Sequence, residues 1–113
     1  MPHDAHVHAA TIRLADDVDP AAVGAAVTTE LCGHWEHDGP CRWPHNNAIR
    51  AGAAGHGLRV VFVASDGEVA HVHACIASAL RAMPGCEVVT DAPDVLQADE
   101  VPLGTRLARP GDE

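Results

Sequence analysis

The chain contains no lysine and no tyrosine, and only three of its 113 residues are aromatic: Trp35, Trp43 and Phe62. Every side-chain cation other than histidine is therefore an arginine. Apolar residues still make up 47% of the chain, so a core must be built mainly from valine, leucine, isoleucine and alanine. A chain of this length is expected to fold as one domain around one core.

Long apolar runs and an excess of positive charge are also absent. No segment approaches the roughly 20 apolar residues that a membrane-spanning helix needs, and the first ten residues lack the basic and apolar regions of a signal peptide. A formal net charge of −9 would repel phosphate backbones and anionic lipids. These absences predict a cytoplasmic protein without nucleic-acid or membrane partners. Its four cysteines are then expected as thiols or metal ligands rather than as disulfides.

The spacing of apolar residues predicts alternating strands and helices. Residues 58–64 form the clearest strand, and residues 7–14 alternate with the period of two that a strand requires. Asp19 and Pro20 predict the start of a helix, because aspartate caps free amides and proline fits the first helical position. Ser65 precedes a second helix. In chain order, the prediction is a strand at 7–14, a helix from 20, strands near 47–51 and at 58–64, a helix ending at 83, and a strand at 86–90.

This order of elements is typical of an α+β fold of the ferredoxin-like split βαβ type. Such a fold places both helices on one face of an antiparallel sheet. Residues 1–90 are therefore predicted to form a single domain, which includes a His/Cys-rich loop at 32–57. The polar, proline-rich segment 91–113 is expected to be an irregular tail.

The most distinctive chemistry lies in residues 32–45, where five thiol or imidazole side chains fall within 14 residues. Zinc prefers thiolate and imidazole ligands in a tetrahedral set, and spacings of two to four residues let one segment surround the ion. Gly39 and Pro40 provide a bend between the two halves. The segment therefore predicts a site for a transition metal such as zinc; the alternatives are an exposed loop without metal and a disulfide. The expected ligands are Cys32, His34, His37, Cys41 and His45.

Other residues are candidates for completing or enclosing this site. His6 and His8 point the same way from the first strand and are expected either to join the ligand set or to lie in a solvated N-terminal arm. Trp35 and Trp43 flank the ligands, and either stack on a flat ligand or anchor the loop to the core; anchoring is the favoured interpretation.

A further group of His and Cys residues lies on the second predicted helix. His71 and Cys75 are four residues apart and share one face, away from the apolar stripe, with His73 at its edge. Ordinary surface positions are favoured for this group over a second metal site.

Three functions are compatible with these features. The first is a small metal-binding carrier, sensor or accessory module. The second is a zinc enzyme, in which Glu36 or Asp38 would act as a general base and Cys41 as a nucleophile. The third is a non-catalytic interaction domain that forms a homodimer through its sheet.

The enzyme hypothesis has a resemblance in its favour. A first-strand histidine (His6 or His8), then Cys41, then Gly55-His56-Gly57 before a valine-rich strand resembles the 6-pyruvoyl-tetrahydropterin synthase family. The resemblance covers about half of the chain and implies a zinc-dependent activity. This chain departs from the family at Leu58, where the family has a zinc-binding histidine, and it is too short for the family's C-terminal strands.

Overall fold

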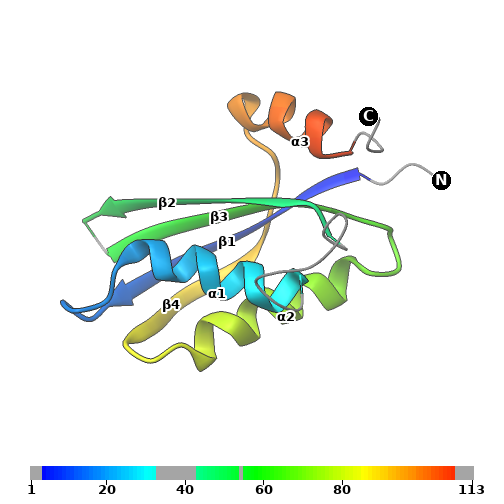
Figure 1. Cartoon of the computed structure of the whole chain (residues 1–113). Helices are drawn as coiled ribbons and strands as arrows, with labels where there is room; N and C mark the ends of the chain where they lie inside the picture. The colour runs from blue at the N-terminus through cyan, green and yellow to red at the C-terminus, as the bar shows by residue number, and fades with distance from the viewer. Residues whose placement is uncertain (1–3, 33–42, 54, 109–113) are drawn as a thin grey trace.

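The computed structural model of the chain describes residues 4–32, 43–53 and 55–108. Within them, no helix has both the length and the apolar character needed to cross a membrane. Figure 1 shows the arrangement of the elements. They are β1 (Asp4–Leu14), α1 (Pro20–Cys32), β2 (His45–Gly52), β3 (Gly55–Ala64), α2 (Val69–Ala82), β4 (Cys86–Asp94), a short 3₁₀ helix η1 (Ala98–Glu100) and α3 (Val101–Ala108).

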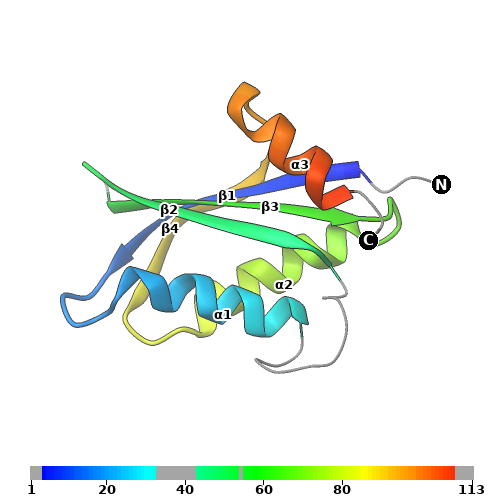
Figure 2. The same cartoon turned by 45° about the horizontal axis from the view of Figure 1, so that its top comes forward.

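The four strands form one antiparallel sheet in the order β2-β3-β1-β4. Helices α1 and α2 lie together on one face of this sheet, and α3 lies across the opposite face (Figures 1 and 2). The predicted α+β class, with an antiparallel sheet and two helices on one face, is confirmed. The third helix is an addition that the sequence interpretation did not contain.

The core lies between the sheet and the α1–α2 layer. The apolar residues of each helix recur every four residues, so they face the sheet together, and the only phenylalanine sits among them with no exposed surface. Apart from Trp43, the remaining residues of the core cluster are aliphatic. The helix residues that form this layer are Val23, Val27 and Leu31 from α1 and Val72, Ile76 and Leu80 from α2.

Helix α1 begins as the sequence predicted and sits close to β2. The Asp19 carboxylate accepts a hydrogen bond from the Ala21 amide at 2.9 Å, which caps the helix that starts at Pro20. The Asn47 side chain on β2 donates to the Gly24 carbonyl at 3.0 Å. A Cβ atom at Gly24 would lie 3.4 Å from that amide, so a small residue suits this close contact between helix and strand.

The expectation of an irregular segment after residue 90 is wrong. Strand β4 continues through Pro93 to Asp94. This proline is tolerated because β4 is an edge strand, where a missing N–H need not break the sheet. Helix α3 then packs on β1 so closely that a Cβ atom at Gly104 would lie 2.9 Å from the Ala5 Cβ. Pro102 stands in the first turn of α3, where no intrahelical donor is needed.

Arg59 on β3 ties this C-terminal segment to the open face of the sheet. Its guanidinium donates to both carboxylate oxygens of Glu100, at 2.6 and 2.9 Å, to Asp94 at 2.8 Å and to the Val95 carbonyl at 2.9 Å. The pKa of Arg59 is raised, chiefly by the hydrogen bond to Glu100, and that of Glu100 is lowered, chiefly by Arg59. The bidentate geometry fixes where α3 begins.

We predict that Arg59→Ala loosens α3 and lowers the free energy of unfolding by about 1.5–3 kcal/mol, the range for hydrogen bonds to charged groups. Arg59→Lys should rescue little, because an ammonium group cannot form the two-pronged contact with Glu100. Amide hydrogen exchange at residues 101–108 and denaturant titration measure the two effects. Arg13→Ala is the control, since Arg13 is exposed and 4.0 Å from its nearest carboxylate on Glu87. Unchanged exchange in α3 in the Arg59→Ala variant would contradict the assignment.

Candidate functional site

Much of the predicted metal segment lies outside the described residues. Cys32 is the last residue of α1, and the chain is described again from Trp43 onward. The ligand, base, nucleophile and stacking candidates that lie outside the described part of the chain are His34, Trp35, Glu36, His37, Asp38 and Cys41.

The two candidates at the end of this segment are bound into the fold. His45 has both ring nitrogens engaged: Nδ1 lies 3.0 Å from the Trp43 carbonyl oxygen and Nε2 lies 3.0 Å from the Thr28 hydroxyl. Nδ1–H therefore donates to the carbonyl, and Nε2 accepts from the hydroxyl. A metal at His45 would have to displace one of these partners. Trp43 is 6% exposed and belongs to the core, which favours its interpretation as an anchor.

His6 and His8 lie within β1, so the expectation of a solvated arm is wrong for these two residues. His8 is 3% exposed, and its ring joins elements that are far apart in the sequence. His8 Nε2 lies 3.1 Å from the Asp91 carboxylate on β4, 83 residues away. His8 Nδ1 lies 2.9 Å from Nδ1 of His73 on α2. Arg81 also donates to Asp91, at 2.8 Å.

The direction of each hydrogen bond follows from the charge of Asp91. The pKa of this carboxyl is lowered, first by the hydrogen bond from Arg81, so it accepts and His8 Nε2–H donates. A neutral His8 then presents a lone pair at Nδ1, which accepts the Nδ1–H of His73. Burial lowers the pKa of both histidines, which keeps the pair neutral. His73 also meets the ring of Phe62 edge-on, with 5.1 Å between ring centroids.

Distance distinguishes this histidine pair from a pair of metal ligands. Two imidazole nitrogens on one tetrahedral zinc lie about 3.3–3.4 Å apart, because each Zn–N bond is about 2.0–2.1 Å long. The 2.9 Å between the two Nδ1 atoms is instead a hydrogen-bond length. His6 Nε2 is buried without a hydrogen-bond partner among the described groups. Across residues 4–32, 43–53 and 55–108, no three His, Cys, Asp or Glu side chains converge to hold a metal.

His71 and Cys75, unlike the histidine pair, are separated by the distance expected for two ligands of one zinc ion. The Sγ atom of Cys75 lies 3.5 Å from Nε2 of His71, a distance at which the two groups also form a hydrogen bond. With a Zn–N bond of about 2.0–2.1 Å and a Zn–S bond of about 2.3 Å, tetrahedral geometry places two such atoms about 3.5–3.6 Å apart. The sequence predicts that these two residues share a helix face, but it gives no distance between their side chains.

The surroundings of this pair connect it to the predicted metal segment. The ring of Trp43 lies 5.5 Å from that of His71, between centroids. The pKa of the Cys75 thiol is raised, first by burial and then by the negative charge of Glu30 on α1. Helix α1 ends two residues after Glu30, at Cys32. Glu30 and Trp43, which stand before and after the predicted metal segment, are therefore both near the His71–Cys75 pair.

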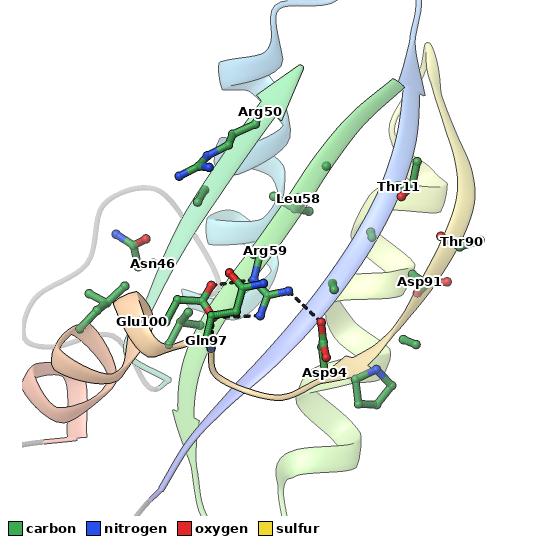
Figure 3. Close-up of a pocket in the computed structure, with 18 of the residues that line it drawn as sticks. Thr11, Asn46, Arg50, Leu58, Arg59, Thr90, Asp91, Asp94, Gln97 and Glu100 are labelled. Atoms are coloured by element: carbon green, nitrogen blue, oxygen red, sulfur yellow. Dashed lines mark hydrogen bonds and ion pairs between the residues drawn. The ribbon is translucent and has the colours of Figure 1, made fainter. Parts of the chain in front are cut away.

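A separate cavity of about 720 Å³ lies on the opposite face of the sheet. Figure 3 shows Arg59 reaching from β3 to Glu100 and Asp94 at one end of it, with Arg50 and Thr11 towards the other. Small side chains on the strands form its floor. Nothing in the sequence predicts this cavity from these residues. The floor includes Ala9, Ala48, Gly57, Thr90 and Ala92.

No protein-family model, no curated protein and no solved structure matches this chain. The arrangement of its own side chains is therefore the basis for assigning a function.

The buried histidine network predicts a pH dependence of stability. Because burial lowers the pKa of folded His8 below its ordinary value of about 6.5, the unfolded chain binds this proton more readily. The contribution of His8 is therefore complete above pH 6.5 and is lost as the pH falls through that value towards the folded pKa. The free energy of unfolding is expected to decrease between pH 7 and pH 5, as measured by urea titration.

His8→Leu should lower stability at pH 7 by about 1–3 kcal/mol, because it leaves the His73 donor unsatisfied. It should also flatten the pH dependence, whereas the control His56→Gln should retain it. A wild-type slope that persists in His8→Leu would show that other groups cause it.

Proposed function

We propose that this protein binds a transition metal such as zinc, at the end of the two-helix layer where α1 terminates. His71 Nε2 and Cys75 Sγ are two of the ligands. The observation that carries the proposal is their 3.5 Å separation, which matches two neighbouring positions of a tetrahedral zinc site. The i, i+4 spacing on α2 is enough by itself to place both side chains on one face of the helix.

The remaining ligands are proposed to come from the thiols and imidazoles that the sequence singled out. Cys32, His34, His37 and Cys41 belong to the segment between Glu30, whose charge acts on Cys75, and Trp43, whose ring lies beside that of His71. Two helix ligands plus two from this segment would complete a four-coordinate site. Trp43 would form an apolar wall beside it, and Glu30 would add negative charge that favours a cation.

The free thiol does not exclude this role. Burial and Glu30 raise the pKa of Cys75, so the thiol stays protonated without metal. A bound cation would displace the thiol proton, so affinity should fall at low pH as protons compete with metal.

We also assign the fold to the ferredoxin-like class. Strand β3 lies between β1 and β2, and β1 lies between β3 and β4. Each strand–helix–strand unit is therefore split by a strand of the other unit, as in the split βαβ pattern. Helix α3 is an addition on the open face.

A carrier, sensor or accessory module is favoured over a zinc enzyme. The 720 Å³ cavity lies on the other face of the sheet, and neither His71 nor Cys75 lines it. The resemblance to the synthase family requires a first-strand histidine as a ligand; His8 is engaged by Asp91 and His73, which leaves only His6 for that role. Leu58, at the position of a family ligand, is 1% exposed within the core.

Cobalt substitution tests the proposal, because a thiolate ligand gives Co²⁺ an intense ligand-to-metal charge-transfer band. We expect one Co²⁺ or Zn²⁺ per chain in tag-free protein, with a charge-transfer band and ligand-field bands typical of tetrahedral coordination. Cys75→Ser and His71→Ala should each weaken metal binding by at least about 100-fold, because even outer-shell partners are worth 10- to 100-fold.

The chain offers a matched control for each variant. Cys86→Ser removes another partly buried thiol, at the start of β4, and His56→Ala removes a histidine on β3. Both should bind metal like the wild type. Tight binding that survives the loss of Cys75 and His71 would exclude this ligand pair, and the absence of any bound metal would reject the function itself.

A further inference from the structure

The two edges of the sheet differ in how they resist pairing with another chain. On β4 the register shifts opposite Thr11 and Ile12, which interrupts the regular edge. Pro93 removes a donor from the same strand, and Glu87, Asp91 and Asp94 add charge. A bulge, a proline and charged side chains are the devices by which natural proteins protect an edge.

Strand β2 has none of these protections except one charge. Its eight residues pair with β3 without a register shift, from His45↔Phe62 to Gly52↔Gly55. It contains no proline, and Arg50 is its only Asp, Glu, Lys or Arg residue. Within the described part of the chain, no strand lies on its outer side. Such an edge is a template for another strand.

The outward-facing backbone groups of β2 can be identified from its pairing. The Val63 amide donates to the Pro44 carbonyl at 3.0 Å, so residue 44 forms a hydrogen-bonded pair with β3. Because hydrogen-bonded and non-bonded pairs alternate in an antiparallel ladder, the even-numbered residues of β2 bond to β3. The N–H and C=O groups of four odd-numbered residues therefore point outward: His45, Asn47, Ile49 and Ala51.

We propose that this edge pairs with β2 of a second copy of the chain, antiparallel about a two-fold axis through Ala48. The two sheets become one sheet of eight strands. This inference concerns the sheet edge and is independent of the proposed metal site.

The side chains of β2 are complementary to themselves in this register. Asn46, Ala48 and Arg50 are exposed and lie on the open face. With the axis at Ala48, each Asn46 lies opposite Arg50 of the second copy, where the guanidinium can donate to the amide oxygen. Ala48 meets Ala48 without a clash. An axis at Arg50 would place two cations directly opposite each other, which is unfavourable.

The adjacent helix surface also suits a second copy. Helix α1 packs beside β2 through the Asn47–Gly24 hydrogen bond (Figure 2). Glu30 is the only charged residue of α1, although charged residues make up 20% of the chain. Joining two β2 edges brings the two α1 helices to the same side of the extended sheet, where uncharged alanine and threonine surfaces do not repel each other.

Analytical ultracentrifugation over a wide range of concentrations tests this proposal, on metal-loaded and on chelator-treated protein. The wild type should be a dimer in both states. Ala51→Pro removes one outward donor and leaves the bonds to β3 intact, and Ala48→Arg places like charges at the axis. Each should weaken the dimer at least tenfold, with the fold checked by circular dichroism.

Ala92→Arg is the matched control, because Ala92 is an exposed alanine on the same face but on the opposite edge strand, β4. It should leave the dimer unchanged. A wild type that stays monomeric, or a dimer insensitive to both β2 variants, would overturn the proposal. So would a dimer lost in Ala48→Arg and Ala92→Arg but kept in Ala51→Pro, because that pattern indicates contact through the open face. A dimer found only with metal bound would point to a metal bridge instead.

Discussion

The antiparallel pairing of β1 with β3 is the contact on which every other part of the structure depends. These two strands occupy the centre of the sheet, β2 can join only through β3, and β4 can join only through β1. The register of this pair sets His6 opposite Phe62 and His8 opposite Val60. It thereby places the histidines of β1 under α2, beside the one phenylalanine of the core. On the other face the same pair supports α3, through Ala5 on β1 and Arg59 on β3.

In this chain without lysine, two arginines each make several hydrogen bonds to acceptors on other elements. Arg59 engages two carboxylates and a carbonyl at once, and Arg81 contacts both oxygens of Asp91. A guanidinium can do this because its donors lie in one plane with a fixed fork, whereas an ammonium is a single point of charge. Arg59 thereby ties the start of α3 to β3, and Arg81 on α2 orients the acid on β4 that binds His8.

Local sequence patterns were sufficient for the central part of the fold. The start of α1 at Pro20, the strand at 58–64 and the apolar face of α2 follow from capping and periodicity, which are short-range properties. The C-terminal segment differs from the prediction because Pro93 and Pro102 are residues typical of irregular segments. Both are tolerated for reasons of position: an edge strand needs fewer donors, and so does the first turn of a helix. Only the assembled sheet shows that position 93 lies on an edge.

The candidate site likewise has features that the sequence predicts and features that only the structure shows. The sequence located a segment rich in thiols and imidazoles and a His–Cys pair on one helix face. It could not show that the pair stands at a ligand-like separation, or that the ring of Trp43 lies beside that of His71. The role of His8 was also out of reach, because its carboxylate partner is 83 residues away. Contacts between residues so far apart in the sequence depend on the whole topology and produce no periodic pattern in the sequence.

The position of β1 in the sheet also bears on how the chain folds during synthesis. β1 is translated before both of its neighbours, β3 and β4, and α1 and β2 separate it from the first of them. Both edges of this central strand therefore stay unpaired until the first residues of β3, which begins at Gly55, have left the ribosome. Pairing over such sequence distances is slow, and exposed strand edges are prone to aggregate in the interval. The nascent chain should therefore be more dependent on chaperones than its small size suggests.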